Sequence, residues 1–109
     1  MEEIPEPDIP FDDDYFIPAD DDHVRREKAK ARKIRDSQWW KNLRGRGICY
    51  YCKKQVPPKE LTMDHIVPII RGGNSTKGNI VACCKKCNSE KKYLTPVEWQ
   101  EFQRKQETL

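Results

Sequence analysis

The sequence predicts a small α+β domain in which a bound metal ion stabilises a strand–loop–strand–helix unit, with one helix before it and one after it. Three observations predict this fold. The chain has 109 residues, of which 36% are hydrophobic and 36% are charged, so only a small core is available. Two C-x-x-C pairs bracket the central part of the chain. Between them lie two short apolar segments separated by turn residues. A core this small usually needs a metal ion or disulfides.

The cysteine pairs predict a structural Zn²⁺ site. Cys49 and Cys52 are separated by 31 residues from Cys84 and Cys87, and four thiolates can surround one tetrahedral zinc ion. No secretion signal or membrane-spanning run is found, so a reducing cytoplasm with cysteines as metal ligands is favoured over disulfides. The fifth cysteine, Cys83, could pair with Cys87 at a longer spacing. The two-residue spacing favours Cys84 as the ligand and Cys83 as a small buried residue.

Charge is distributed unevenly along the chain. Residues 1–22 contain ten Asp or Glu and no Lys or Arg, whereas residues 23–109 have a net charge of +13. The basic part predicts a polyanionic partner, and nucleic acid is the first candidate. The acidic part, residues 1–22, contains four prolines and is expected to be a disordered tail. Three roles stay open for this tail: solubilising the chain, docking on a partner protein, or competing with DNA for the basic surface.

Residues 23–44 predict one basic helix. No Pro or Gly interrupts them, and Ala, Lys, Arg and Glu dominate. Asp21 or Asp22 is expected to cap its start, and Gly45 and Gly47 to end it.

Two functions are expected of this helix. Ten basic residues lie between Arg25 and Arg46, which favours contact with phosphates. At the C-terminal end, Trp39, Trp40 and Leu43 are expected to cover the small core rather than stack on a base.

The segment between the cysteine pairs predicts two strands and a helix. Residues 61–67 and 79–82 have strand composition, and the Gly-rich residues 72–76 form a turn. A helix is expected over residues 85–92. The order is therefore strand, loop, strand, helix.

A last helix is expected over residues 95–106. Thr95 as N-cap, Pro96 at the first helical position and Glu98 completing a capping box mark its start. Its apolar residues are expected to pack against the domain: Val97, Trp99 and Phe102.

Asp64 and His65 are adjacent residues of the first predicted strand. Side chains alternate between the two faces of a strand, so a regular strand would separate them. A bulge or the end of the strand would be needed for both to serve one site. Each alone is most often a surface residue, as Asn79 alone is a turn residue and Asn88 alone a helix-surface residue. Only the whole set points to an active site.

That set resembles the HNH endonuclease family, which belongs to the ββα-metal, or His-Me finger, nucleases. The resemblance covers residues 46–93. The family's final histidine is an asparagine here, which is a known alternative in the family. The matching motifs, in order, are Cys49-x-x-Cys52, Asp64-His65-Ile66-Val67-Pro68, Gly72-Gly73-Asn74, Asn79-Ile80, Cys84-x-x-Cys87-Asn88 and Lys91.

The resemblance implies a metal-dependent endonuclease that hydrolyses DNA phosphodiester bonds, by nicking or by double-strand cleavage, to 5′-phosphate and 3′-hydroxyl ends. It implies that His65 is the general base. Asp64 and Asn88 would be ligands of one catalytic divalent cation, Mg²⁺ or Mn²⁺. Asn79 would orient His65.

The same resemblance implies DNA as the partner, which we expect to be double-stranded. No base-reading element is identifiable, so a weak sequence preference is expected. No membrane partner is expected, and the chain is expected to be a monomer or dimer that is cytoplasmic and prokaryotic or phage-encoded. The alternative is a non-catalytic zinc-ribbon module that binds nucleic acid. The four cysteines and the basic helix suit that alternative equally, but it leaves Asp64, His65, Asn79 and Asn88 unexplained. A zinc finger that binds protein would leave the basic charge unexplained.

Overall fold

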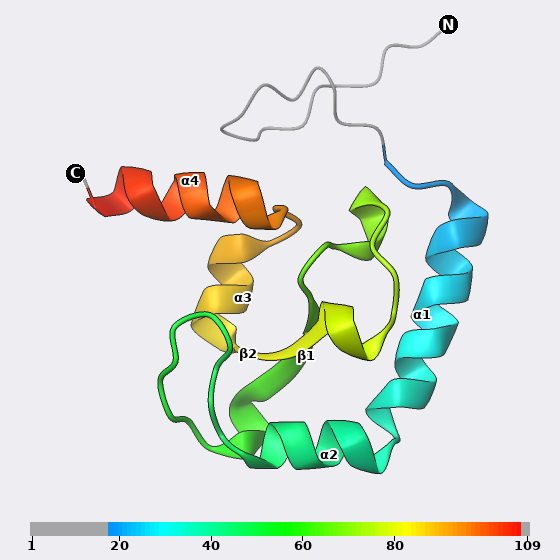
Figure 1. Cartoon of the computed structure of the whole chain (residues 1–109), viewed down its shortest axis with the longest axis horizontal. Coiled ribbons are helices and arrows are strands. Elements are labelled where there is room, and N and C mark those ends of the chain that lie inside the picture. Colours follow the sequence, from blue (N-terminus) through cyan, green and yellow to red (C-terminus); the bar gives the residue numbers. More distant parts are fainter. Residues whose placement is uncertain (1–17, 108–109) are drawn as a thin grey trace, which may run out of the picture.

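A two-stranded antiparallel hairpin lies at the centre of the molecule, with helices around it (Figure 1). The structure is a computed structural model, and it describes residues 18–107. Helices α1 and α2 precede the hairpin and α3 and α4 follow it, so the predicted order of strand, loop, strand and helix is confirmed. Single 3-10 turns occupy residues 58–60, 69–71 and 77–79. The elements are α1 (Asp21–Arg35), α2 (Gln38–Gly45), β1 (Leu61–His65), β2 (Ile80–Cys84), α3 (Lys85–Lys91) and α4 (Pro96–Glu107).

The single helix expected over residues 23–44 is in fact two helices. Ser37 separates them: its hydroxyl donates to the Ile34 carbonyl at 2.5 Å and accepts from the Trp40 N–H at 3.2 Å. Serine is a favoured N-cap because its oxygen satisfies an N–H group of the first helical turn. The chain turns at this residue, so α1 runs alongside the central unit while α2 crosses beneath it (Figure 1).

The start of α1 also differs from the prediction. Asp20 is the N-cap, accepting from the His23 N–H at 2.8 Å, and Asp21 and Asp22 lie in the first turn. The Ala19 N–H donates to the Ile70 carbonyl at 2.7 Å, so the chain is already held against the loop before the helix begins. Residues 19–22 are therefore ordered, contrary to the prediction. Residues 1–17 of the predicted acidic tail lie outside the described residues.

The hairpin has a regular register. The five residues of β1 pair with those of β2 from Leu61 opposite Cys84 to His65 opposite Ile80, and this pairing contains no bulge. Trp40 of α2 is 3% exposed and packs on the hairpin, while Trp39 and Leu43 are partly buried beside it. The prediction that this end of the basic segment covers the core is confirmed. Cys83, with no exposed surface, is the small buried residue that was expected.

Helix α4 begins as predicted. The Glu98 carboxylate accepts from the Thr95 N–H at 3.0 Å, which is one half of a capping box. Trp99 is buried and stacks on Phe102 with a centroid distance of 5.6 Å. Val97 is 71% exposed, so the expectation that it packs against the domain is wrong. The reason is its position in the helix: Trp99 occupies the face that packs, and Val97 is two residues, or about 200°, away from it.

Within the described residues, no helix combines the length and apolar character needed to cross a membrane.

Candidate functional site

Two separate groups of side chains could take part in function, and the first is the cluster of four cysteines. The Sγ atoms of Cys49, Cys52, Cys84 and Cys87 all lie within 4.8 Å of one another. The Cys52 and Cys84 sulfurs are 3.9 Å apart. Four sulfurs bound tetrahedrally at about 2.3 Å from Zn²⁺ lie about 3.8 Å from one another. The cluster therefore fits a zinc ion closely in both ligand type and spacing.

Short-range backbone contacts build the first half of this cluster. Lys53 follows the first pair with a φ of 64°, and its N–H donates to the Cys49 carbonyl at 2.9 Å. This turn brings the two sulfurs of the pair to the same side. The Tyr50 N–H then donates to the Ala82 carbonyl of β2 at 2.9 Å. The pair is thereby fastened to the hairpin whose last residue, Cys84, begins the second pair.

Hydrogen bonds from the backbone prepare one thiol for metal binding. Burial raises the pKa of Cys49, but hydrogen bonds from backbone N–H groups, led by that of Cys84, lower it by more. The net result is a pKa of about 7, below the ordinary value for a thiol. Burial and the neighbouring sulfurs raise the pKa of Cys87. Burial likewise raises the pKa of Cys83, whose sulfur lies outside the cluster and donates to the Cys84 carbonyl at 3.3 Å. Cys83 is thus held as an inert thiol next to the ligands.

The second group lies at the end of β1, and its first member is Asp64. This carboxylate is 9% exposed, and its Oδ2 atom accepts from the Tyr51 hydroxyl at 2.7 Å and lies 3.3 Å from the Lys91 ammonium. Lys91 has no exposed surface and also donates to the His65 carbonyl at 3.1 Å. Burial and the hydrogen bond to Asp64 both raise the pKa of Tyr51, so its hydroxyl keeps its proton and donates. Both contacts use Oδ2.

His65 is the last residue of β1, and its ring points to the other face of the hairpin. The strand is regular, so Asp64 turns toward α3 and His65 turns toward the loop before β2, as alternation requires. Of the two arrangements that could let Asp64 and His65 serve one site, the structure has the strand end and not the bulge. The Nε2 atom of His65 lies 2.9 Å from the Ser75 hydroxyl. Burial lowers the pKa of His65, the charges of Lys91 and Arg35 lower it further, and those of Asp64 and Glu27 partly offset this.

Ser75 is in turn held by Glu27 of α1. The Ser75 N–H donates to Glu27 Oε1, and the Ser75 hydroxyl donates to the Glu27 main-chain carbonyl, both at 2.6 Å. Both residues are buried, with exposures of 4% and 3%. The Ser75 N–H is the main cause of the lowered pKa of Glu27, and the Lys30 ammonium, 3.0 Å from Oε2, adds to it.

Asn79 holds the loop together instead of contacting the His65 ring directly. Its amide oxygen accepts from the Val67 N–H at 2.9 Å, and its amide nitrogen donates to the carbonyls of Val67 and Asn74. Its own carbonyl accepts from the Ile66 N–H at 2.9 Å, next to His65.

Gly73 makes the tight path of this loop possible. A Cβ atom on Gly73 would lie 1.8 Å from the Val67 carbonyl oxygen, so no other residue fits there without a shift of the backbone.

Asn88 lies exposed on α3, three residues before Lys91. Residues three apart share a helix face, and Lys91 reaches Asp64 from that face. Asn88 is therefore about 60° from Lys91 around the axis of α3, but its side chain is exposed whereas that of Lys91 is buried.

Sequence reasoning missed Glu27, Ser75 and Tyr51. Glu27 is one acidic residue within a basic helix, and Ser75 lies in a turn of small polar residues. A signal existed for Glu27, because it lies four residues before Ala31 and extends the apolar stripe of Ala31 and Ile34 along one face of α1. Nothing in the sequence indicates its partner, 48 residues away.

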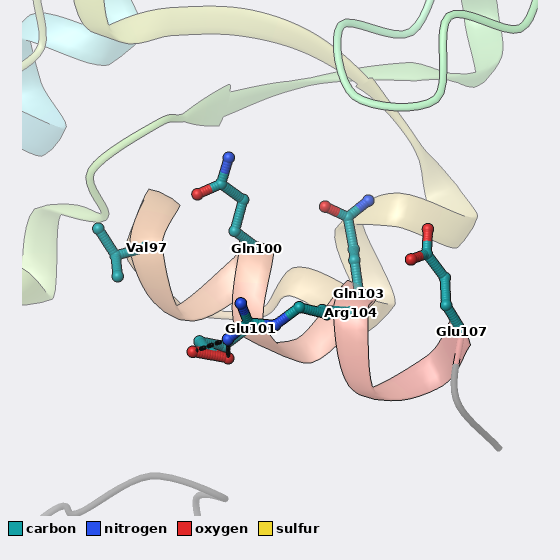
Figure 2. A pocket seen from close by; sticks show the side chains of 6 residues that line it. All are labelled: Val97, Gln100, Glu101, Gln103, Arg104 and Glu107. Carbon is teal, nitrogen blue, oxygen red and sulfur yellow. Dashed lines mark hydrogen bonds and ion pairs between the residues drawn. The ribbon is translucent and has the colours of Figure 1, made fainter.

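A separate hollow of about 490 Å³ runs along α4 (Figure 2). Its lining includes an ion pair between Glu101 and Arg104 and the exposed side chain of Val97, and it contains no residue of either group described above.

Comparison with known proteins agrees with this arrangement. Residues 49–100 match the profile of the HNH endonuclease family. A stretch of 52 residues is 36% identical to part of the CRISPR-associated endonuclease Cas9 of Actinomyces naeslundii. The stretch amounts to 47% of this chain but 5% of that relative, so the likeness concerns one small part of a much longer protein.

Proposed function

Because residues 49–100 match the HNH endonuclease family, we propose that this chain is an endonuclease that hydrolyses phosphodiester bonds of DNA with the help of a divalent cation. The observation that carries the proposal is the end of β1. There Asp64 and His65 point to the two faces of the hairpin, each held by its own buried partners. A phosphodiester lying across this strand end would meet both side chains.

His65 is the proposed general base. Burial lowers its pKa, so at neutral pH the imidazole is uncharged and can accept a proton. It takes that proton from a water molecule, and the resulting hydroxide attacks phosphorus in line with the 3′ oxygen that leaves. The products are a 5′-phosphate and a 3′-hydroxyl end.

Asp64 and Asn88 are the proposed ligands of the catalytic cation. A carboxylate and an amide oxygen are the donors that Mg²⁺ and Mn²⁺ prefer, and Lys91 and Tyr51 use only one oxygen of Asp64. When bound, the cation neutralises charge on the phosphate and on the leaving oxygen. Lys91 and Tyr51 fix the orientation of the Asp64 carboxylate. Asn79 is proposed to orient His65 through the backbone of Ile66, which it holds.

Helix α1 is the proposed DNA-binding surface. Glu27 and Ala31 are buried against the rest of the domain, whereas seven basic side chains of α1 are exposed. Two turns of this helix lie beside the loop that contains Ser75, so DNA bound along the basic side would pass close to His65. The exposed basic residues are Arg25, Arg26, Lys28, Lys30, Arg32, Lys33 and Arg35.

The test is cleavage of supercoiled plasmid by the purified, zinc-loaded chain with Mg²⁺ or Mn²⁺. The wild type is expected to produce nicked circles, and His65→Ala to lower the rate by about a hundredfold or more while its zinc content and fold are unchanged. Gln103→Ala, at an exposed position of α4 outside both groups of side chains, is the control. End-labelling then tests for 5′-phosphate groups.

A non-catalytic zinc module is the alternative function, and the cysteine cluster and the basic face of α1 suit it as well. It predicts DNA binding without any nicks, and equal behaviour of His65→Ala and the wild type. That result would refute the endonuclease proposal.

A further inference from the structure

A chain of buried hydrogen bonds leads from α1 to the ring of His65. Its members are Glu27, Ser75 and His65, and every donor and acceptor along it can be assigned from the atoms present. Glu27 lies outside the segment that matches the endonuclease family, 22 residues before its first residue. The support that these hydrogen bonds give to His65 therefore comes from the N-terminal helix of this protein, outside the part that matches the family.

The hydroxyl of Ser75 determines which atoms donate and which accept along this series of hydrogen bonds. A serine hydroxyl has one hydrogen to donate. The Glu27 main-chain oxygen, 2.6 Å away, can only accept, so the Ser75 hydrogen is directed to it. The Nε2 atom of His65, 2.9 Å from the same hydroxyl, must then be the donor. A neutral imidazole has one N–H group, so its Nδ1 atom has the free electron pair.

Glu27 prevents Ser75 from turning. Its Oε1 atom accepts from the Ser75 N–H at 2.6 Å, so the same residue holds Ser75 through both its main chain and its side chain. Lys30 holds the other carboxylate oxygen at 3.0 Å. Two further contacts fasten α1 to the loop: His23 Nε2 lies 2.9 Å from the Gly73 carbonyl, and the Ala19 N–H donates to the Ile70 carbonyl.

We propose that Ser75 and Glu27 are positioning residues that fix the His65 ring with its Nε2–H donated to Ser75, so that Nδ1 is the atom that accepts the proton from water. Helix α1 is then part of the catalytic unit as well as a DNA-binding surface. This inference rests on the proposed endonuclease function for its catalytic meaning. The hydrogen-bond chain itself can be tested without catalysis.

The first experiment uses NMR to determine which ring nitrogen of His65 carries the proton. The sample is the full, zinc-loaded, ¹⁵N-labelled chain without added Mg²⁺. The pH is about 8.5, which is about two units above the ordinary histidine pKa of about 6.5, so the His65 ring is neutral. The expected spectrum has a protonated, slowly exchanging Nε2–H for His65 and an unprotonated Nδ1. In Ser75→Ala that slowly exchanging proton should disappear. His23 is the internal reference, because its Nε2 atom faces a carbonyl that Ser75 does not touch.

The second experiment measures plasmid nicking at saturating and at limiting DNA. Ser75→Ala is expected to lower kcat by about tenfold to a hundredfold, part of what a positioned proton acceptor contributes, with DNA affinity unchanged. Ser75→Thr, which keeps the hydroxyl, is expected to restore the rate. Glu27→Gln keeps an acceptor for the Ser75 N–H, so its kcat should stay near the wild-type value. Glu27→Leu removes that acceptor, so its kcat should be lowered about as much as that of Ser75→Ala.

The outcomes separate the two proposals. A wild type that cuts no DNA refutes the endonuclease function, and the NMR spectrum then decides alone whether the hydrogen-bond chain exists. An Nδ1–H ring in the wild type overturns the inference. So does a Ser75→Ala protein that nicks at the wild-type kcat, because the hydroxyl then positions nothing that catalysis needs. If Glu27→Leu fails to fold, Ser75→Ala still decides, since it removes only one buried oxygen.

Discussion

The cysteine cluster and the proposed hydrolytic site, formed by Asp64, His65 and their partners, lie on the same hairpin but are assembled differently. The cluster is made from two short local segments, Cys49 to Lys53 and Cys84 to Cys87, and the Tyr50 N–H fastens the first to Ala82 of β2. The site at the end of β1 depends on partners from far along the chain. Ser75 is held by Glu27, 48 residues before it, and Asp64 by Lys91, 27 residues after it.

This difference separates two requirements of a small domain. The cluster can supply folding free energy that a core of this size lacks, because the site and the fold form together. The proposed hydrolytic site would contribute the chemistry, and the contacts that support it can be lost while the fold survives. Loss of a zinc ligand should therefore have a global effect, and loss of a site residue a local one.

Replacing a zinc ligand should have the largest effect. Cys49→Ser is expected to release the zinc and unfold the domain, since binding of a structural zinc supplies about 10–16 kcal/mol whereas a whole domain is stable by about 5–15 kcal/mol. Zinc content and far-UV circular dichroism measure the result. Cys83→Ala is the matched control: this thiol is equally buried and next to a ligand, yet its removal should leave one zinc per chain and the fold intact. A folded, zinc-free Cys49→Ser protein would contradict the prediction.

Replacing Lys91 should have the next largest effect, and it should be local. Lys91→Met removes the buried ammonium and leaves the Asp64 carboxylate with Tyr51 as its remaining partner, which is expected to lower the free energy of unfolding by about 3 kcal/mol. Zinc content should stay at one per chain. Urea unfolding followed by tryptophan fluorescence measures the loss, and Lys92→Met, on the exposed neighbour, is the control. Equal stabilities of the two variants would show that the Asp64–Lys91 pair contributes little.

The contrast between local and long-range contacts also explains how much of the structure the sequence predicts. The zinc cluster, the strands at 61–65 and 80–84, and the start of α4 depend on spacing and on caps within a few residues, so sequence patterns predict them well. Ser37 was within reach of the same reasoning, because a serine followed by a new apolar pattern is a helix-start signal. The break between α1 and α2 was missed because Ala, Lys and Arg composition outweighed that one residue.

The supports of the hydrolytic site were out of reach for a physical reason. Asp64 and His65 are visible as a motif, but Glu27 looks like any surface charge on a basic helix until its partner is known. Its burial depends on the tertiary position of Ser75, which no local pattern encodes. For Asn79 the motif predicts a role but not the contacts. It predicts that Asn79 orients His65, whereas in the structure the Asn79 side chain contacts the backbone of the loop between the two residues.

Neutralising the exposed face of α1 should weaken DNA binding without affecting either group on the hairpin. The variant carries five changes to Gln and keeps Lys30, whose ammonium holds Glu27. Each lost phosphate contact should reduce the slope of log K against log salt by about 0.9, equally for all DNA sequences. Fluorescence anisotropy across salt concentrations measures this slope. The changed residues are Arg25, Arg26, Lys28, Arg32 and Lys33.

The control for this variant is the pair Arg104→Gln and Lys105→Gln, two exposed changes on α4, on the other side of the molecule from α1 (Figure 1). It should leave the slope unchanged. If both variants reduce the slope equally for each charge removed, DNA is attracted by total charge and α1 is not the binding surface.

The smallest expected effect concerns the tie between α4 and the loop of the hydrolytic site. Arg71 donates to both oxygens of Glu98 at 2.8 and 3.0 Å, and the Thr95 N–H donates to one of them. Burial raises the pKa of Glu98, but the hydrogen bonds from Arg71 and Thr95 lower it more, so its pKa is below the ordinary value. Glu98→Gln removes the charge and keeps most of the shape, and should reduce the free energy of unfolding by about 1 kcal/mol near pH 7.

The pH dependence of that loss tests its cause. A carboxylate with a depressed pKa in the folded state stabilises the protein above its unfolded-state pKa, about 4.3 for Glu, and loses that contribution as the pH falls through the folded value. Between pH 6 and 8 both values lie well below the pH, so the difference between wild type and Glu98→Gln should be constant. Urea titrations of the zinc-loaded proteins measure it. Glu101→Gln, which breaks the more exposed pair with Arg104 on the same helix, should cost almost nothing. A difference for Glu98→Gln that changes steeply between pH 6 and 8 would require another group, such as a histidine, to be coupled to this tie.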